Sequence, residues 1–239
     1  MMQSCEVPAA LFFPLIGEAL IFDPMDRRKP LEILDQNSLP MLPGYVRLAW
    51  SRMDAEGGQD GLSGEEHEEM ASLGSVRRRR EYGMSRMLIR RLAGTAGMEP
   101  AELRILREEG GRPYGEYRGR RVHLSLTHTD RRIACVLSGD GQVGLDMEPE
   151  GRRVHAHLRS RMMHPGEVKP MESVDTLRIW TLKEAMLKLQ GRGLRTNMNE
   201  VCLSPDGEGR FEAIFNNEMR AKICSFTHDG HWVALAYFI

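Results

Sequence analysis

The 239-residue chain repeats one short motif at a fixed separation, and this repeat limits the possible folds more than any other feature. Leu124-Ser-Leu-Thr-His128 is followed by the apolar run Ile133–Leu137. Cys224-Ser-Phe-Thr-His228 is likewise followed by Trp232–Ala236, and the two Thr-His pairs lie 100 residues apart (227 − 127). Alternating apolar and polar residues of this kind predict two similar strand pairs.

Helix-like stretches precede both strand pairs at nearly the same separation. One extends from Ser75 to Gly94 and the other from Ser173 to Gly191, so their starts are 98 residues apart (173 − 75) and their ends 97 (191 − 94). Three landmarks at nearly one offset predict two halves of like topology, related by duplication. Chance similarity between strand-rich segments is the alternative.

The expected fold class is therefore α+β: two pseudo-duplicated lobes with mostly antiparallel sheets, and a site in the cleft between them. Residues 1–43 contain six of the chain's twelve prolines, which disfavours long regular elements, and we assign them to an N-terminal extension. We expect the two lobes to cover residues 44–145 and 146–239. Ser63 and Glu66 form a capping-box pattern at the start of an additional helix.

Composition excludes several classes of protein. The net charge is −1 (33 − 34), which gives no general attraction to nucleic acid or to membranes. The basic run Arg77–Arg80 leaves nucleic-acid binding as a weak alternative. Prolines and Glu18 interrupt the apolar run Val7–Phe22, so we expect neither a membrane span nor a signal peptide. The four cysteines form no C-x-x-C pair, and free thiols are typical of a cytoplasmic protein.

Two carboxylates end a predicted strand at Gly144-Leu-Asp-Met-Glu148. Side chains alternate across a strand, so Asp146 and Glu148 share one face while Leu145 and Met147 share the other. Neighbouring carboxylates repel each other unless a cation or proton intervenes, and a hard cation such as Mg²⁺ prefers oxygen ligands. This pair is either a metal site or a solvated acidic strand end.

A second group of polar residues lies in the helix-like segment Trp180-Thr-Leu-Lys-Glu-Ala-Met-Leu-Lys188. Trp180, Glu184 and Lys188 are four residues apart and so share one helical face. Glu184 and Lys188 could be only an exposed ion pair. However, the chain has five lysines against 28 arginines (33 − 5), and two of the five lie in this segment. Lysine offers a compact, titratable charge that arginine does not.

The order of four motifs resembles the two-lobed, Sfp-like 4′-phosphopantetheinyl transferases. The motifs are Gly-Arg-Pro-Tyr at 111–114, Leu-Ser-Leu-Thr-His at 124–128, Gly-Leu-Asp-Met-Glu at 144–148, and Trp-Thr-Leu-Lys-Glu-Ala-Met-Leu-Lys at 180–188. The family pattern is G-K/R-P, S-H or T-H, G-I-D-I/V-E and W-x-x-K-E-A/S-x-x-K. The resemblance covers about residues 45–239, and the last two motifs are the specific ones. Residues 1–43 have no counterpart in it.

The resemblance implies a role for each matching residue. Asp146, Glu148 and Glu184 match metal-binding acids, and Lys188 matches a lysine near the diphosphate of coenzyme A (CoA). Further residues match CoA-binding positions: Arg112, Thr127 and His128, and more loosely Arg80 and Arg86. Asp146, Glu184 and Lys188 are thus the expected catalytic group.

The activity implied is Mg²⁺-dependent transfer of 4′-phosphopantetheine from CoA to a serine of an apo acyl or peptidyl carrier protein, with release of 3′,5′-ADP. We expect a monomer that binds no nucleic acid. A non-catalytic CoA- or nucleotide-binding module and a different Mg²⁺-dependent diphosphatase are the alternatives. The Arg-, His- and Met-rich segment 150–171 is either a docking rim for an acidic carrier protein or a mobile polar loop.

Overall fold

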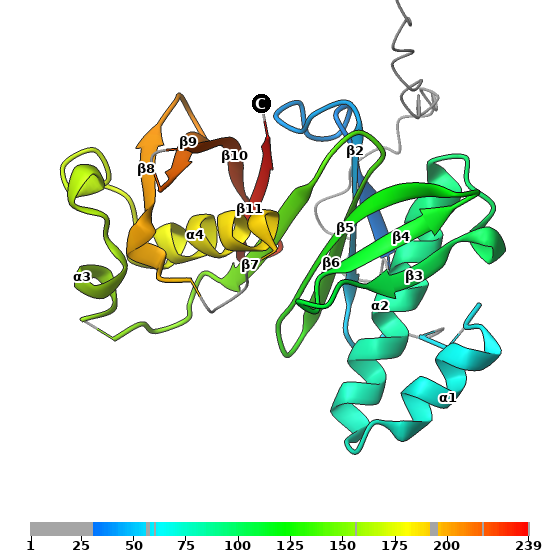
Figure 1. The fold of residues 1–239 in the computed structure, drawn as a ribbon. Coiled ribbons are helices and arrows are strands. Elements are labelled where there is room, and N and C mark those ends of the chain that lie inside the picture. Colours follow the sequence, from blue (N-terminus) through cyan, green and yellow to red (C-terminus); the bar gives the residue numbers. More distant parts are fainter. Residues whose placement is uncertain are drawn as a thin grey trace, which may run out of the picture.

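The computed structural model describes residues 31–55, 58–59, 61–155, 157–191, 196–216 and 218–238, which form two sheets with helices packed on them (Figure 1). The elements of the first half are β1 (Leu31–Leu34), β2 (Val46–Arg52), α1 (Gly64–Ser72), α2 (Val76–Thr95), η1 (Pro100–Glu102), β3 (Arg104–Arg107), β4 (Pro113–Tyr117), β5 (Arg120–His128) and β6 (Arg132–Ser138). Those of the second half are β7 (Val143–Pro149), α3 (Leu158–Met162), η2 (Pro165–Glu167), α4 (Thr176–Gln190), η4 (Met198–Glu200), β8 (Val201–Pro205), β9 (Arg210–Phe215), β10 (Met219–His228) and β11 (His231–Phe238).

The two halves have the same topology, which confirms the duplicated α+β fold. The first sheet has the order β1-β2-β6-β5-β4-β3 and the second the order β7-β11-β10-β9-β8, and every pairing is antiparallel. Without the edge strand β1, the orders match when β2 is equated with β7 and β3–β6 with β8–β11. The helices α2 and α4 then occupy the same place in the chain.

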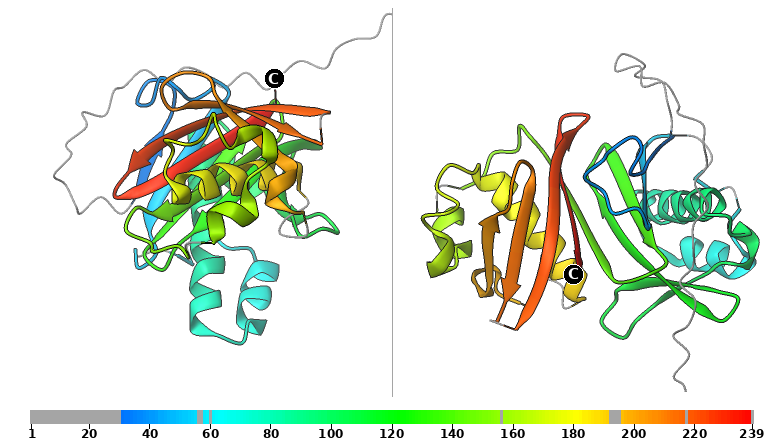
Figure 2. Two further views of the ribbon diagram at one scale, coloured as in Figure 1. Left: turned by 90° about the vertical axis from the view of Figure 1, so that its left-hand side faces the viewer. Right: turned by 90° about the horizontal axis from the view of Figure 1, so that it is seen from above.

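The sheets pack on each other, and each carries its helix on the other face. Leu48, Val136, Leu145 and Leu235 belong to a buried cluster made by β2, β6, β7 and β11 between the sheets. A second cluster joins α2 to the first sheet, and a third joins α4 to the second sheet. Seen from above, α2 lies on the side of the first sheet that faces away from the second (Figure 2). Strand alternation therefore supplies two apolar faces per sheet.

Strand β7 places the predicted acids toward α4. Leu145 and Met147 are buried in the cluster between the sheets, while Asp146 contacts α4 on the opposite face. Gly144 allows this close approach, because a Cβ at this position would collide with backbone atoms of Ala185 and Leu189 in α4. Glycine is needed where two backbones come this close.

Some element boundaries differ from those predicted. Helix α2 continues past Gly94 to Thr95, and Gly97 adopts the positive φ of 76° that follows a helix end. Strand β1 lies within the stretch assigned to the N-terminal extension, yet it pairs with β2; residues 1–30 lie outside the described residues. Strand β7 contains the expected lobe boundary at residues 145/146, and the chain passes between the sheets after Ser138.

None of the described helices is long and apolar enough to cross a membrane.

Candidate active site

Helix α4 presents three polar or amphipathic side chains on the face opposite its core. Asp175 caps its start by accepting hydrogen bonds from Leu177 N and Arg178 N, and Gly191 ends it with a positive φ of 73°. The apolar face is fully buried, whereas Trp180, Glu184 and Lys188 are partly exposed. The predicted helical face is therefore formed.

Asp146 lies at the centre of the polar contacts between β7, β5 and α4. Its Oδ1 accepts hydrogen bonds from Lys188 Nζ at 2.7 Å and from Thr127 Oγ1 at 3.2 Å. Lys188 Nζ also donates to the carbonyl oxygen of Leu126 at 3.3 Å. Lys188 thus links α4 to β5 in two ways: directly, through the carbonyl oxygen of Leu126, and indirectly, through Asp146 and Thr127.

Thr127 does not line the pocket expected to bind CoA. Its side chain is buried, and its hydroxyl donates to Asp146 and accepts from Met147 N at 3.3 Å. The hydroxyl therefore orients Asp146 and fixes β7 beside β5. These contacts give Thr127 a positioning role, and the ligand contact that the resemblance implies stays a prediction.

The environment of Glu184 disfavours its charge. Burial and, second, the nearby charge of Asp146 raise the pKa of this carboxyl and Lys188 lowers it, with a net pKa of about 7. Glu184 Oε1 and Asp146 Oδ2 are buried and have no hydrogen-bond partner among the described residues. Two carboxylates that repel each other and have unpaired buried oxygens favour the binding of a cation between them, or of a proton to one of them.

Glu148, the third predicted acid, contacts Arg152. The Arg152 guanidinium also lies 5.7 Å from the centre of the Trp180 ring. In the part of the chain that the structure describes, no three His, Cys, Asp or Glu side chains form a group that could hold a metal ion. Asp146 and Glu184 lie close together and Glu148 is directed to Arg152, so the three-acid metal site stays a prediction.

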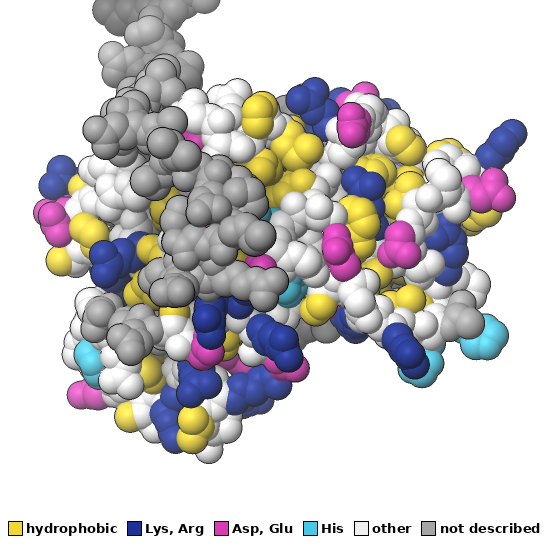
Figure 3. Space-filling model, turned by 180° about the vertical axis from the view of Figure 1, so that it is seen from behind, with side chains coloured by type: hydrophobic (Ala, Val, Ile, Leu, Met, Phe, Trp, Pro, Cys, Tyr) yellow, Lys and Arg dark blue, Asp and Glu magenta, His cyan; other side chains and the backbone are white. Residues whose placement is uncertain are grey.

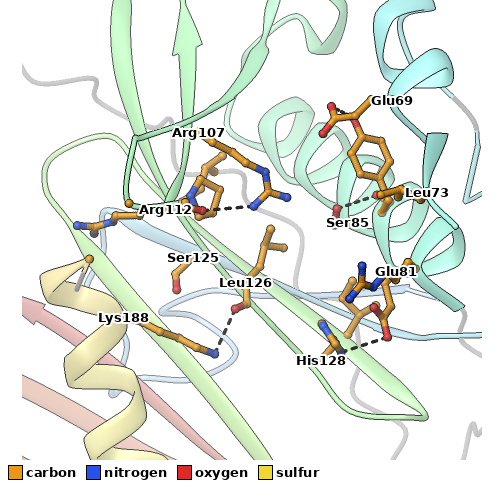
Figure 4. A pocket seen from close by; sticks show the side chains of 18 residues that line it. Glu69, Leu73, Glu81, Ser85, Arg107, Arg112, Ser125, Leu126, His128 and Lys188 are labelled. Atoms are coloured by element: carbon orange, nitrogen blue, oxygen red, sulfur yellow. Dashed lines mark hydrogen bonds and ion pairs between the residues drawn. The ribbon is translucent and has the colours of Figure 1, made fainter. Parts of the chain in front are cut away.

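A pocket of about 520 Å³ lies next to these residues and is lined by both halves (Figure 4). Lys188 and Gly191 contribute the second-half side, and His128 lies at the end of β5. Its first-half lining comes from α1, α2, the β3–β4 turn, β5 and β6: Glu69, Leu73, Arg78, Glu81, Tyr82, Ser85, Arg107, Gly110, Gly111, Arg112, Pro113, Leu124, Ser125, Leu126, His128 and Ile133. The pocket thus unites the predicted residues Arg112, His128 and Lys188.

Arg112 packs against the end of α4. Its Cδ and Nη1 lie 3.0 and 3.2 Å from the position that a Cβ of Gly191 would occupy, and its Nη2 donates to Val143 O at 3.4 Å. Burial lowers the pKa of this guanidinium. A cation is favourable at the C-terminal end of a helix, so Arg112 joins the two halves as well as lining the pocket.

Arg80 and Arg86 do not line the pocket, and Arg78 and Arg107 do. Arg86 is buried between α1 and α2, where its Nε lies 3.1 Å from Glu66 Oε1. This ion pair gives Arg86 a structural role between the two helices, and its expected CoA contact stays a prediction. Sequence analysis did not assign Arg107 to the pocket, although its position beside the Gly-Arg-Pro turn was an available signal, nor Arg78, which lies two residues before Arg80. Basic side chains are prominent where α1 and the start of α2 project from the body (Figure 3).

A buried ion pair behind α4 was also missed. Lys183 and Glu167 pair with both side chains fully buried, and Lys183 Nζ donates to three carbonyl oxygens, those of Met162, Met198 and Val201. The lysine bias of this segment was the available signal. Lys183 anchors α4 to its flanking segments, and only Lys188 reaches the pocket.

Residues 142–236 match the sequence model of the 4′-phosphopantetheinyl transferase superfamily. This matched segment contains β7, α4 and the strands β8 to β11 of the second half. It is also 26% identical over 223 residues to a Synechocystis sp. (strain ATCC 27184 / PCC 6803 / Kazusa) protein named "Putative 4'-phosphopantetheinyl transferase". That similarity covers 83% of this chain and 82% of the relative. Both similarities support phosphopantetheinyl transfer as the general class of activity.

Proposed function

We propose that this protein is a 4′-phosphopantetheinyl transferase, which transfers 4′-phosphopantetheine from CoA to a serine of an apo acyl or peptidyl carrier protein and releases 3′,5′-ADP. The observation that carries the proposal is the position of Glu184, Asp146 and Lys188 beside a pocket with several cations. Arg78, Arg107 and Arg112 line this pocket, and none of them forms an ion pair with a carboxylate of the described residues. Such a pocket suits a ligand with several phosphates.

The acids fit a divalent cation, which we propose to be Mg²⁺. Asp146 and Glu184 supply unpaired buried carboxylate oxygens, and Glu148 adds a third carboxylate whose charge is felt by Glu184. An all-oxygen set of this kind suits a hard cation. When bound, Mg²⁺ would supply positive charge against the diphosphate oxygens.

The chain's own residues then have distinct roles. The serine oxygen bonds to the phosphorus that carries pantetheine, and the bond from this phosphorus to the bridging oxygen breaks. Glu184, with its pKa near neutrality, takes the serine proton. Lys188, held by Asp146 and Leu126 O, faces the pocket and stabilises the charge on the leaving 3′,5′-ADP. Arg112 and His128 position CoA.

Two features support the two-lobed, Sfp-like subtype and a carrier protein as acceptor. The sheets of the two halves have equivalent strand orders, and both halves line one pocket. Segment 150–171 begins directly after β7, beside the acids, and it contains the exposed residues Arg152, Arg153 and Lys169. An acidic partner would complement these charges. We place the protein in the cytoplasm, as a monomer.

Mass spectrometry of an apo carrier protein incubated with CoA and the enzyme tests this function. Loading should add the phosphopantetheine mass, require a divalent cation and release 3′,5′-ADP. CoA binding without loading of any carrier in a panel of acyl and peptidyl types would favour a non-catalytic binding module. Release of 3′,5′-ADP without a protein acceptor would favour a diphosphatase.

A further inference from the structure

The pocket contains two carboxylates, which is unexpected for a site that binds a polyanion. The charged side chains that line it with His128 are Glu69, Arg78, Glu81, Arg107, Arg112 and Lys188. Glu69 accepts a hydrogen bond from the Tyr82 hydroxyl at 2.6 Å, so its place is explained by the packing of α1 on α2. Glu81 has no such packing role and faces the end of β5.

Glu81 bridges a cation on its own helix to the imidazole in the pocket. Its Oε1 lies 2.7 Å from Arg77 Nε. The same oxygen lies 3.8 Å from His128 Nδ1, a contact drawn in Figure 4. Arg77 also reaches Asp130, two residues beyond His128, at 2.9 Å. The Glu81 side chain is 20% exposed and that of His128 is 42% exposed. Glu81 and Arg77 therefore fix the end of β5 against the start of α2.

The direction of this contact determines what His128 can offer to a ligand. A carboxylate beside Nδ1 favours a proton on that nitrogen and thereby sets the orientation of the ring. Nε2 is then the nitrogen that remains for a ligand.

We propose that Glu81 is a positioning residue that directs His128 Nε2 toward the phosphomonoester of CoA and so makes binding selective for CoA over dephospho-CoA. The inference rests on the proposed function, because it takes CoA as the ligand. Lys188 is bonded to Asp146 and so belongs to the diphosphate end of the pocket. His128 and Arg78 lie on the α2 side, which leaves them for the other phosphate. Arg77 offsets part of the negative charge of Glu81 and so reduces its repulsion of the ligand.

Calorimetric titration with CoA and with dephospho-CoA tests the proposal, because the two ligands differ only in the 3′-phosphate. Glu81→Gln should weaken CoA binding about tenfold, as loss of an imidazole-orienting partner typically does, and should change dephospho-CoA binding much less. Glu69→Gln is the matched control, since it removes one negative charge from the same pocket without touching His128. Tighter CoA binding by Glu81→Gln would mean that Glu81 only repels phosphate and would overturn the proposal.

A double-mutant cycle with His128→Gln separates positioning from a general loss of structure. Glu81→Gln should have almost no further effect on CoA affinity in the His128→Gln background, and an undiminished effect there would also refute the role. ¹⁵N NMR of the imidazole provides a readout without any ligand: neutral His128 should carry its proton on Nδ1 in the wild type and shift toward Nε2 in Glu81→Met. An unchanged tautomer would contradict the proposal. If the wild-type protein binds no CoA, the proposed function itself is wrong. If Glu81→Gln still prefers CoA over dephospho-CoA as strongly as the wild type does, only the role proposed for Glu81 is wrong.

Discussion

The two halves share one strand order but differ in what their equivalent elements carry. In the second half, β7 and α4 bring Asp146 and Glu184 together beside Lys188. In the first half, Met87 stands 97 residues before Glu184, and it is buried in the apolar core under α2. The first half instead contributes the three arginines of the pocket, Arg78, Arg107 and Arg112. Duplication thus supplied one scaffold twice, and the two copies specialised in different side chains.

The halves also differ at the Thr-His pairs that revealed the repeat. In β5, Leu124 packs under α2, and His128, four residues later, faces the same side. In β10, Ile223 packs under α4, so His228, five residues later, faces the opposite side, where its ring lies 4.8 Å from that of Trp50. A shift of one residue exchanges the faces of a strand. Only the first-half histidine therefore reaches the pocket.

Replacement of Asp146, an acid that only the second half carries, is expected to have the largest effect on activity. Asp146→Asn should lower the rate of carrier loading by about a thousandfold or more, because it removes the charge that holds Lys188 and adjoins Glu184. The rate is followed by the mass of the carrier protein. Asp206→Asn removes a surface acid paired with Lys222 and serves as the control. Near-wild-type loading by a folded Asp146→Asn protein would refute the active-site assignment.

Both halves secure their main helix by a buried ion pair, and this likeness can be tested through stability. Glu66 of α1 binds Arg86 and Arg90 of α2, while Glu167 of η2 binds Lys183 of α4. Lys183→Met should lower the free energy of unfolding by about 3–5 kcal/mol, since it leaves the Glu167 carboxylate buried without its cation.

Chemical denaturation of Lys183→Met and of a Lys183→Met/Glu167→Leu double variant measures this effect. The double variant should recover much of the lost stability, because no uncompensated charge remains. Equal stability of the single and double variants would show that the charge of Glu167 is relieved in another way.

The raised pKa of Glu184 predicts how stability depends on pH in a metal-free buffer. The folded state binds this proton more tightly than the unfolded chain, whose glutamate titrates near 4.5. The contribution of protonated Glu184 is therefore complete below that pH and is lost as pH rises to about 7. Across this window, wild type should lose about 2 kcal/mol relative to Glu184→Gln. Parallel stability curves of the two proteins, from denaturation at several pH values, would disprove the shift.

The fold could be predicted from sequence because its strongest signals are local. The alternation of polar and apolar residues predicted which side chains of β7 share a face. The capping box of Ser63 and Glu66 is formed as expected at α1. Strand β1, which was not predicted, is four residues long and lies in a proline-rich stretch. It is a strand because it pairs with β2. Strand pairing between distant segments leaves no local pattern.

The site was predictable only in part, because several roles depend on which neighbour a side chain meets. Asp146, Glu184 and Lys188 come together as their spacing and the family resemblance imply. Arg86 carries the same charge as Arg78, and nothing in the sequence shows that Glu66 of a different helix occupies it. Thr127 likewise contacts Asp146 only because β5 and β7, from different sheets, lie side by side.

The smallest predicted effects distinguish the two histidines of the repeat. His128→Gln should weaken CoA binding about tenfold with little change in stability, because its ring is partly exposed and faces the pocket. His228→Gln should leave CoA affinity unchanged and lower the unfolding free energy by about 1 kcal/mol. His228 Nε2 lies 3.0 Å from Glu32 Oε2, and the His228 ring packs against Trp50. Calorimetry with CoA and thermal denaturation of both variants measure the contrast. A loss of CoA affinity in His228→Gln would show that the second histidine also serves the pocket, and the specialisation of the halves would then be incomplete.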